Sequence, residues 1–325
     1  MHLLNVQPGA IDDGGEAVDI GQSPADIVIL SAADTELATL ATAHGAIGPP
    51  APCLRLANLL HLRHPMSVDL YAEQTLVRAR IVIVRLLGGR SYWPYGVEQL
   101  IAGARNGGFK LMLLPGDDKP DDDLRSASTI RGEPYDRLWA YFVHGGATNA
   151  RGAIAYAATL IGQGEVPPQA APLLAAGLYW PKLANPGLAE LRPQWQAGRP
   201  LAAITFYRAL LQSGQTGTID ALIETLASAG LNALPVYAQS FKDPLAADIV
   251  ARALAKASPQ VVINLTGFAL SAPGHTHAPT LMDTPGGVVL QAVMAGVSRA
   301  AWEQSSRGLG VRDIAMNVAL PEIDG

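Results

Sequence analysis

Residues 79–96 read Ala-Arg-Ile-Val-Ile-Val-Arg-Leu-Leu-Gly-Gly-Arg-Ser-Tyr-Trp-Pro-Tyr-Gly, which is a strand signal followed directly by a loop signal. The apolar run at the start, bounded by turn residues, predicts a buried strand. Gly88 and Gly89 at its carboxyl end allow the backbone to turn sharply and to approach a ligand closely. Ligands of open α/β sheets bind beyond the carboxyl ends of the strands, so the stretch predicts an α/β fold with a candidate site in this loop.

The loop concentrates aromatic and cationic side chains. Besides the glycine pair, its candidate substrate-binding residues are Arg90, Tyr92, Trp93 and Tyr95. Flat rings and a guanidinium suit a large, planar, anionic ligand. We expect Arg90 to contact a substrate carboxylate, because a guanidinium can form two parallel hydrogen bonds with that group.

Two charged features beside the loop have structural explanations. Arg85 lies in the apolar strand and must find a partner, because an unpaired buried charge is costly, and we expect Asp69 or Asp117 to supply it. The acidic run from Asp117 to Asp123 has the oxygen ligands of a divalent-cation site. We favour a solvated turn and a helix start, where carboxylates suit the helix dipole.

Alternation of strand and helix patterns continues outward from this stretch. In the first half we expect strands at 3–6, 27–31, 81–87 and 110–114, helices at 34–44 (ended by Gly45), 67–78, 97–106, 135–144 and 150–161, and either structure at 53–60. In the second half we expect strands at 201–207, 233–238, 260–266 and 315–320, helices at 218–228 and 245–256, and either structure at 288–294. Such βαβ alternation indicates parallel sheets.

The fold class is therefore α/β, with two Rossmann- or flavodoxin-like parallel-sheet units joined by a helical, Pro-rich connector. Prolines recur from residue 167 to residue 200 and exclude long regular elements there. The predicted domains are an N-terminal α/β domain at 1–150, the connector at 151–200 and a second Rossmann-like domain at 201–325. The second domain is expected to be incomplete at its C-terminus.

Composition excludes several classes of protein. Apolar residues make up 49% and charged residues 16% of the 325, which is typical of a packed globular chain. A net charge of −5 gives no electrostatic reason to bind nucleic acid, and no apolar run is long enough to span a membrane. The single cysteine, Cys53, and the lack of a signal peptide favour a cytoplasmic location.

The second domain lacks nucleotide-binding motifs. Residues 208–218 follow a predicted strand and contain Gly214 and Gly217. They match neither the dinucleotide fingerprint nor the P-loop, so we expect an ordinary strand-to-helix turn and no ATP bound by this chain. The same absence argues against a Rossmann-type dehydrogenase.

One loop carries candidate metal ligands. His275 and His277 lie two residues apart between glycine and proline residues after the predicted strand at 260–266, and Asp283 follows. Imidazole nitrogens can bind Co²⁺. The spacing does not define a third ligand, so we favour solvated loop histidines as the interpretation of this pair.

Several blocks together carry a family resemblance. They are Ile11-Asp-Asp-Gly14, Ser23-Pro-Ala-Asp-Ile-Val28, Leu30-Ser-Ala-Ala-Asp-Thr-Glu-Leu37, His64-Pro-Met-Ser-Val-Asp-Leu-Tyr71, the loop at 85–96 and Leu320-Pro-Glu-Ile-Asp-Gly325. In this order they resemble the large, CobN-type subunit of aerobic cobaltochelatase, a family related to the porphyrin-binding subunit of magnesium chelatase. Members of that family are several times longer, so the resemblance implies that this chain is the N-terminal portion of a larger polypeptide.

The resemblance implies a function. Such a subunit binds the tetrapyrrole in a multi-subunit, ATP-dependent ligase that inserts Co²⁺, as substrate, into hydrogenobyrinic acid a,c-diamide during aerobic cobalamin biosynthesis. It also implies AAA+ ATPase and co-chaperone-like partner subunits that use the ATP, and an isolated N-terminal portion that is inactive. Two alternatives stay open: a magnesium-chelatase-type subunit acting on a porphyrin, and a non-catalytic docking module for the AAA+ partners. The residues that insert the metal are expected beyond Gly325, and no catalytic residue is assigned within this chain.

Overall fold

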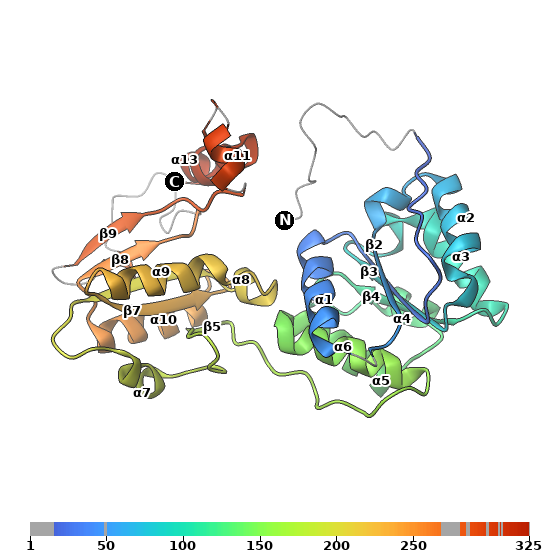
Figure 1. The fold of residues 1–325 in the computed structure, drawn as a ribbon, viewed down its shortest axis with the longest axis horizontal. Helices are drawn as coiled ribbons and strands as arrows, with labels where there is room; N and C mark the ends of the chain where they lie inside the picture. The colour runs from blue at the N-terminus through green and yellow to red at the C-terminus, as the bar shows by residue number, and fades with distance from the viewer. Residues whose placement is uncertain are drawn as a thin grey trace. The chain divides into compact units, whose positions relative to one another are not determined.

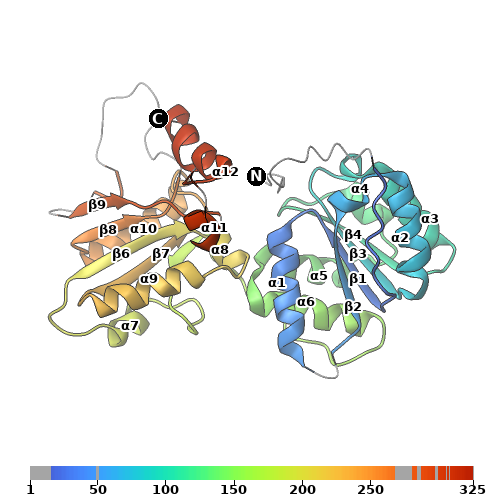
Figure 2. The ribbon, with the colours of Figure 1, turned by 45° about the horizontal axis from the view of Figure 1, so that its top comes forward.

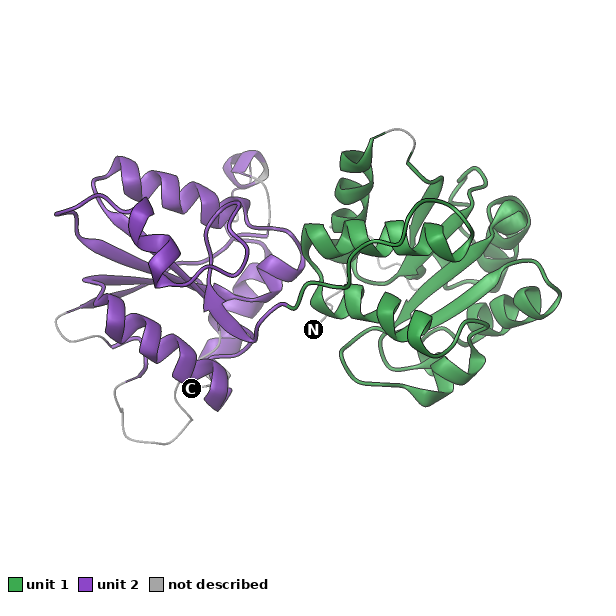
Figure 3. Cartoon of the chain, turned by 90° about the horizontal axis from the view of Figure 1, so that it is seen from below, with its two compact units in different colours: residues 1–172 green, residues 173–325 purple. Residues whose placement is uncertain are grey.

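The structure is a computed structural model that describes residues 16–48, 51–267, 280–283, 287–296, 299–304, 306 and 308–324. The chain forms two compact units, Met1–Pro172 and Leu173–Gly325 (Figure 3). Each unit is a layered α/β structure with its own sheet (Figure 1). The division falls inside the expected connector at 151–200, because the helix before Pro172 packs on the first sheet while the strand after it joins the second.

The first sheet contains four parallel strands in the order β2-β1-β3-β4. They are β1 (Ile27–Ser31), β2 (Leu54–Asn58), β3 (Ile81–Leu86) and β4 (Lys110–Pro115). In the register, Ile27 of β1 lies between Leu54 of β2 and Ile81 of β3. The chain adds β2 on one side of β1 and then crosses to β3 on the other, so the strand order reverses between β1 and β3. Ligands of open α/β sheets bind at such a reversal.

Six helices cover the two faces of the first sheet (Figure 2). They are α1 (Asp34–Ile47), α2 (Pro65–Gln74), α3 (Pro94–Arg105), α4 (Asp122–Ala127), α5 (Glu133–His144) and α6 (Gly146–Leu160), and three 3₁₀ turns occur at η1 (Leu59–Leu62), η2 (Leu76–Arg78) and η3 (Arg90–Tyr92). Alternate residues of a strand point to opposite faces. Ile81 and Ile83 therefore pack with α1, α5 and α6, while Val82 and Val84 pack with α2, α3 and α4.

The second sheet contains five strands in the order β5-β7-β6-β8-β9. They are β5 (Ala176–Leu178), β6 (Leu201–Tyr207), β7 (Asn232–Ala238), β8 (Val261–Asn264) and β9 (Val288–Gln291). All are parallel except β5, which runs antiparallel to β7. The order reverses between β6 and β8, as it does between β1 and β3 in the first sheet.

Two long helices cover the central strands of the second sheet. α9 (Gly217–Ser228) packs beside Phe206, and α10 (Pro244–Ala257) packs beside Leu234 on the other face. The remaining elements are α7 (Leu188–Leu191), η4 (Arg192–Gln194), α8 (Ala209–Gln212), α11 (Arg299–Gln304), α12 (Val311–Ile314), η5 (Ala315–Ala319) and α13 (Leu320–Asp324). Within the described ranges, no helix combines the length and apolarity needed to cross a bilayer.

The predicted fold class is confirmed, since two largely parallel sheets are covered by helices. The ambiguous segments 53–60 and 288–294 contain strands β2 and β9. The predicted strand at 315–320 is wrong: these residues form the π-helix η5 and the start of α13. A short apolar run has no periodicity that separates strand from helix, which explains the error. The first predicted helix continues through Gly45 to Ile47, and the predicted strand at 3–6 lies outside the described residues.

Candidate functional site

The glycine pair forms the turn that the sequence predicts at the carboxyl end of β3. Gly88 and Gly89 have φ angles of +92° and +75°, a region in which residues with a side chain are strained. A Cβ atom on Gly89 would lie 3.2 Å from a carboxylate oxygen of Asp121. The turn therefore brings the loop close to the N-terminus of α4.

Arg90 joins the loop to α4. Its Nε lies 2.7 Å from Oδ2 of Asp123, and its Nη2 donates to the Asp123 carbonyl at 3.0 Å. The two side chains are 38% and 66% exposed, so water screens the pair. An exposed ion pair of this kind contributes about 0–1 kcal/mol. An anion that binds Arg90 more tightly could therefore displace the Asp123 carboxylate with only a small loss of free energy.

Trp93 is a core residue. Its side chain is only 5% exposed, and its Nε1 donates to the Leu62 carbonyl at 2.7 Å. A Cβ atom on Gly96 would lie 2.1 Å from the indole ring, so helix α3 packs directly against it. In this structure the indole faces are covered by protein, because burying so large a ring stabilises the unit more than exposing it.

Tyr92 and Tyr95 lie in different environments. Tyr92 is 41% exposed, whereas Tyr95 is half-buried and its hydroxyl donates to Oδ1 of Asp69 at 2.8 Å. That hydrogen bond to a carboxylate raises the pKa of Tyr95. Of the predicted side chains in the loop, the structure thus presents Arg90 and Tyr92 at the surface and anchors Trp93 and Tyr95.

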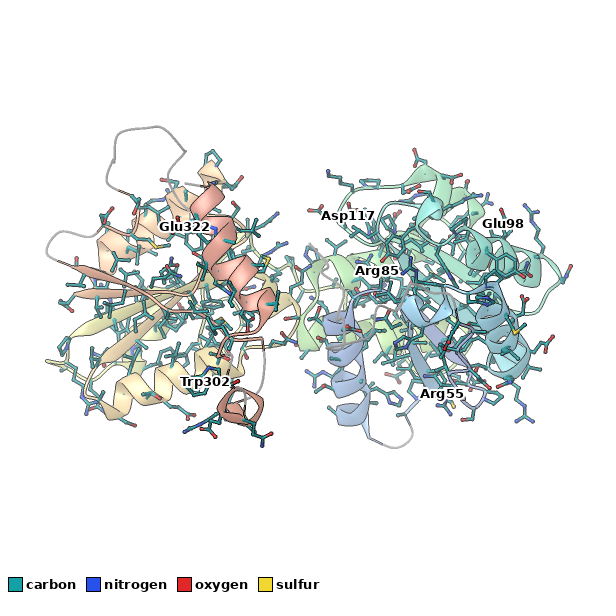
Figure 4. The ribbon with its side chains drawn as sticks, turned by 90° about the horizontal axis from the view of Figure 1, so that it is seen from above. Arg55, Arg85, Glu98, Asp117, Trp302 and Glu322 are labelled. Carbon is teal, nitrogen blue, oxygen red and sulfur yellow. The ribbon has the colours of Figure 1, made fainter. Side chains whose placement is uncertain are left out.

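Arg85 is the centre of a buried network that the sequence did not predict. Its Nε donates to Oε1 of Glu36 at 3.2 Å, and its other nitrogens donate to the carbonyls of Pro115 and Gly116. Ser31 donates to the second carboxylate oxygen of Glu36 at 2.7 Å. These residues join β1, β3, β4 and α1 at the strand-order reversal, where Figure 4 shows Arg85 among the packed elements of the first unit.

The prediction that Asp69 or Asp117 pairs with Arg85 is wrong, because Glu36 is its partner. Asp69 accepts from Tyr95, and Asp117 accepts from the backbone of Lys119. The signal for Glu36 was present: it lies in the first turn of the helix after β1, and the carboxyl end of β1 adjoins that of β3. Only the strand order makes those two ends neighbours.

The acidic run begins a helix, as predicted. Asp121 is the N-cap of α4 and accepts from the backbone of Asp123 and Leu124. Within the described part of the chain, no group of three His, Cys, Asp or Glu side chains is placed to hold a metal ion. His275 and His277 lie outside the described residues, and Asp283 instead accepts from the Thr280 hydroxyl at 3.0 Å.

The corresponding edge of the second sheet has a neutral network. The Oδ1 atom of Asn264 accepts from the hydroxyls of Thr205 at 2.9 Å and Thr266 at 2.8 Å. Its Nδ2 donates to Oε1 of Gln291 at 2.7 Å. The four side chains connect β6, β8 and β9 and have no net charge. Amide and hydroxyl groups satisfy one another here, as buried polar groups must.

Comparisons with known proteins agree on one family. A model described as CobN/magnesium chelatase matches residues 139–325. Over its whole length the chain is 48% identical to the aerobic cobaltochelatase subunit CobN of a Sinorhizobium species and 42% identical to that of Pseudomonas aeruginosa, and it covers 26% of each. A 156-residue match to a magnesium-chelatase subunit of Cereibacter sphaeroides is 26% identical and covers 46% of this chain and 13% of that protein.

A solved structure has a similar fold. The catalytic subunit of cobaltochelatase from Mycobacterium tuberculosis superposes with a TM-score of 0.66 and 25% sequence identity. The match covers 93% of this chain and 24% of that one. The chain thus spans about a quarter of the length of the curated relatives that it matches.

Proposed function

The chain belongs to the CobN/magnesium chelatase family, and from this premise we propose that it is the N-terminal, tetrapyrrole-binding part of a cobaltochelatase subunit. The observation that carries the proposal is the identity of 48% over the whole chain with a cobaltochelatase subunit, against 26% over less than half of it with a magnesium-chelatase subunit. The proposed reaction is the ATP-dependent insertion of Co²⁺ into hydrogenobyrinic acid a,c-diamide in aerobic cobalamin biosynthesis. AAA+ ATPase and co-chaperone-like subunits would hydrolyse the ATP, and this chain alone would bind without inserting metal.

The loop after β3 offers suitable groups for such a substrate. A tetrapyrrole has a flat macrocycle and carboxylate side groups, which need apolar or aromatic cover and a cation respectively. Tyr92 is the exposed ring of the loop, and Arg90 is its cation. Among the described residues, Arg90 is held by the carboxylate and the backbone carbonyl of Asp123, and because that carboxylate is exposed, a substrate carboxylate can compete with it.

The other loop residues would position these two. Trp93 fixes the start of α3 in the core, Tyr95 is tied to α2 through Asp69, and Gly88 and Gly89 set the turn. Rigid anchoring of a contact loop lowers the entropy cost of binding. In this proposal Arg90 and Tyr92 touch the substrate and the remaining residues hold the loop.

The test is a titration of the purified chain with hydrogenobyrinic acid a,c-diamide, followed by absorbance, with a porphyrin as the control ligand. We expect saturable binding that the porphyrin does not reproduce. Arg90→Ala should weaken binding about tenfold, the effect of losing one charge-assisted contact of about 1.5 kcal/mol. Asp123→Ala should strengthen binding, because it removes the carboxylate that competes for Arg90 and leaves only the bond to the backbone carbonyl of residue 123. Arg252→Ala, which removes an exposed ion pair on α10, is the matched control.

The outcomes separate the alternatives. Preference for the porphyrin would support a magnesium-chelatase-type subunit. A folded chain that binds neither tetrapyrrole but captures the AAA+ subunits would be a docking module. Unchanged affinity in Arg90→Ala, Asp123→Ala and Tyr92→Ala would remove this loop from the site.

A further inference from the structure

Arg63 is an exposed arginine that lies close to the loop after β3. It directly follows the 3₁₀ turn η1, which itself follows β2. Among the described residues, none forms a hydrogen bond or an ion pair with its side chain. A guanidinium with no partner in the protein can offer all five of its N–H donors to an anionic ligand.

Two hydrogen bonds join the loop to the segment that carries Arg63. Nε1 of Trp93 donates to the carbonyl of Leu62, the residue before Arg63, at 2.7 Å. The hydroxyl of Tyr95 donates to Oδ1 of Asp69 on α2 at 2.8 Å. Helix α2 also packs against η1 and against α3, which begins one residue after Trp93 (Figure 1). The end of η1, the start of α2 and the loop therefore lie side by side at the carboxyl edge of the first sheet.

Met66 adds an exposed apolar side chain to this part of the surface. It lies in the first turn of α2, three residues before Asp69, and residues three apart share one face of a helix. Tyr95 contacts that face through Asp69, yet the Met66 side chain is 56% exposed. Tyr92 in the loop is exposed as well. A flexible thioether and an aromatic ring are both suited to covering a flat apolar molecule.

The opposite flank of the loop is acidic. Arg90 contacts Asp123 there, and Asp121 and Asp122 precede Asp123 at the start of α4. Like charges repel, so a ligand with several carboxylates is disfavoured on this flank. Such a ligand, held by Arg90, is therefore expected to extend toward the side of the loop that carries Arg63.

We propose that Arg63 and Met66 complete the tetrapyrrole site: Arg63 binds a second carboxylate of the substrate, and Met66 covers the macrocycle together with Tyr92. This role rests on the proposed function, because the ligand of the Arg90 loop is taken to be a tetrapyrrole. Arg63 precedes α2 and Arg90 precedes α3, and packed helices lie about 8–10 Å apart. The two guanidinium groups thus extend from backbones about one helix spacing apart, which suits two different carboxylates of one macrocycle.

The experiment is an absorbance titration of the purified 325-residue chain with hydrogenobyrinic acid a,c-diamide. Arg63→Ala should weaken binding about tenfold through loss of one charge-assisted contact, and the double variant with Arg90→Ala should weaken it about a hundredfold. Met66→Ala should weaken binding about threefold through loss of apolar contact, and Met66→Leu should retain most of the affinity. The matched controls are Arg105→Ala, in the exposed last turn of α3, and Val77→Ala, exposed beyond the other end of α2. Both controls should leave the affinity unchanged.

The fully methyl-esterified ligand distinguishes direct contact from an effect on the fold. Esterification removes the negative charges of the ligand and keeps its macrocycle. With the ester, Arg63→Ala should no longer weaken binding, whereas Met66→Ala should still weaken it about threefold. An equal loss in Arg63→Ala with the acid and with the ester would show that this arginine does not bind a carboxylate and would overturn its role.

The same titrations separate this role from the proposed function. If Arg90→Ala weakens binding while Arg63→Ala and Met66→Ala do not, the loop binds the substrate and the extension toward α2 is wrong. A double variant no weaker than either arginine variant alone would mean that both arginines serve the same carboxylate, which contradicts a second contact. If a folded chain binds no tetrapyrrole, the proposed function fails and the extension fails with it.

Discussion

Strands β3 and β9 have similar sequences and opposite environments. Ile81–Leu86 is buried at every position, whereas Val288–Gln291 is exposed at every position. Both begin as β-branched, apolar runs of the kind that predicts an interior strand of a parallel sheet. β3 lies between β1 and β4 under helices on both faces, while β9 is a sheet edge. The difference teaches that the sequence of β9 is typical of an interior strand, although the described residues of the second unit leave it exposed.

The polar networks at the strand-order reversals of the two sheets also differ: the first is charged and the second is neutral. At the strand-order reversal of the first unit, Arg85 and Glu36 form a buried ion pair. At the reversal of the second unit, Asn264 binds Thr205 and Thr266 in a neutral network. A buried charge that loses its partner costs more than a neutral group that loses one hydrogen bond. We therefore expect substitution of the polar residues at the strand-order reversal to lower the stability of the first unit more than that of the second.

The largest expected effect is at Trp93. Trp93→Ala should lower the free energy of unfolding of the first unit by about 3–5 kcal/mol, because it empties a large core site and removes the bond to Leu62. Equilibrium amide hydrogen exchange in β3 measures the free energy of unfolding of the first unit alone. Tyr92→Ala, one residue away and exposed, should change it by less than about 0.5 kcal/mol. Similar values for both variants would contradict the packing assigned to Trp93.

Arg85→Met should destabilise the first unit by about 3 kcal/mol, because it leaves Glu36 largely buried without its cation. The loss should be smaller in the double variant with Glu36→Gln, since the uncompensated charge is then also removed. The double-mutant cycle is measured by the same β3 exchange. Additive effects would show that Arg85 and Glu36 are not coupled. Arg252→Ala on the second unit is the control for loss of an exposed pair.

Asn264→Leu should lower the stability of the second unit by about 2 kcal/mol, because two threonine hydroxyls then lose their shared acceptor. Gln291→Ala removes an outer partner of the same network and should cost less. Amide exchange in β6 reports the result. If Asn264→Leu lowered stability more than Arg85→Met does, the expectation that the charged network matters more than the neutral one would be wrong.

Both units should lose stability in alkali. Burial raises the pKa of Tyr135 in the first unit and of Tyr179 in the second to about 12, from 10.0. Each folded unit then holds a proton that the unfolded chain releases, so this contribution is complete below about pH 10 and declines as pH rises from about 10 to 12. Urea unfolding at several pH values measures the slope. Tyr135→Phe should flatten it for the first unit only, and an unchanged slope would exclude that tyrosine as its source.

The smallest expected effect is at Leu290. In the 325-residue chain, Leu290→Ala should change the stability of the second unit by less than about 0.5 kcal/mol, because the side chain is already exposed. Ile83→Ala, at a comparable position in the fully buried β3, should cost about 2–5 kcal/mol. Exchange of β6 and β3 amides reports the two values. A large loss at Leu290 would show that the chain covers β9 in solution.

Elements with long, clear periodicity were predictable. The strand at 201–207 and the helix at 218–228 agree with β6 and α9 to within one residue, because the turn residues around them are unambiguous. The segment at 315–320 was not predictable, since its apolar run suits either structure and packing against Gly267 accompanies the helical form. The position of the glycine turn at the end of β3 was predictable, but the burial of Trp93 beside it was not.

Local chemistry in the sequence was enough to establish an α/β fold, a glycine turn after β3, a helix start at the acidic run and a charge at Arg85 that needed a partner. Each of these depends on residues that are neighbours along the chain. The choice of Glu36 for Arg85, the covered face of Trp93 and the uncovered faces of β9 depended on strand order and on which helices pack where. Those relations join residues far apart in the chain, and only packing in three dimensions selects among the partners that sequence allows.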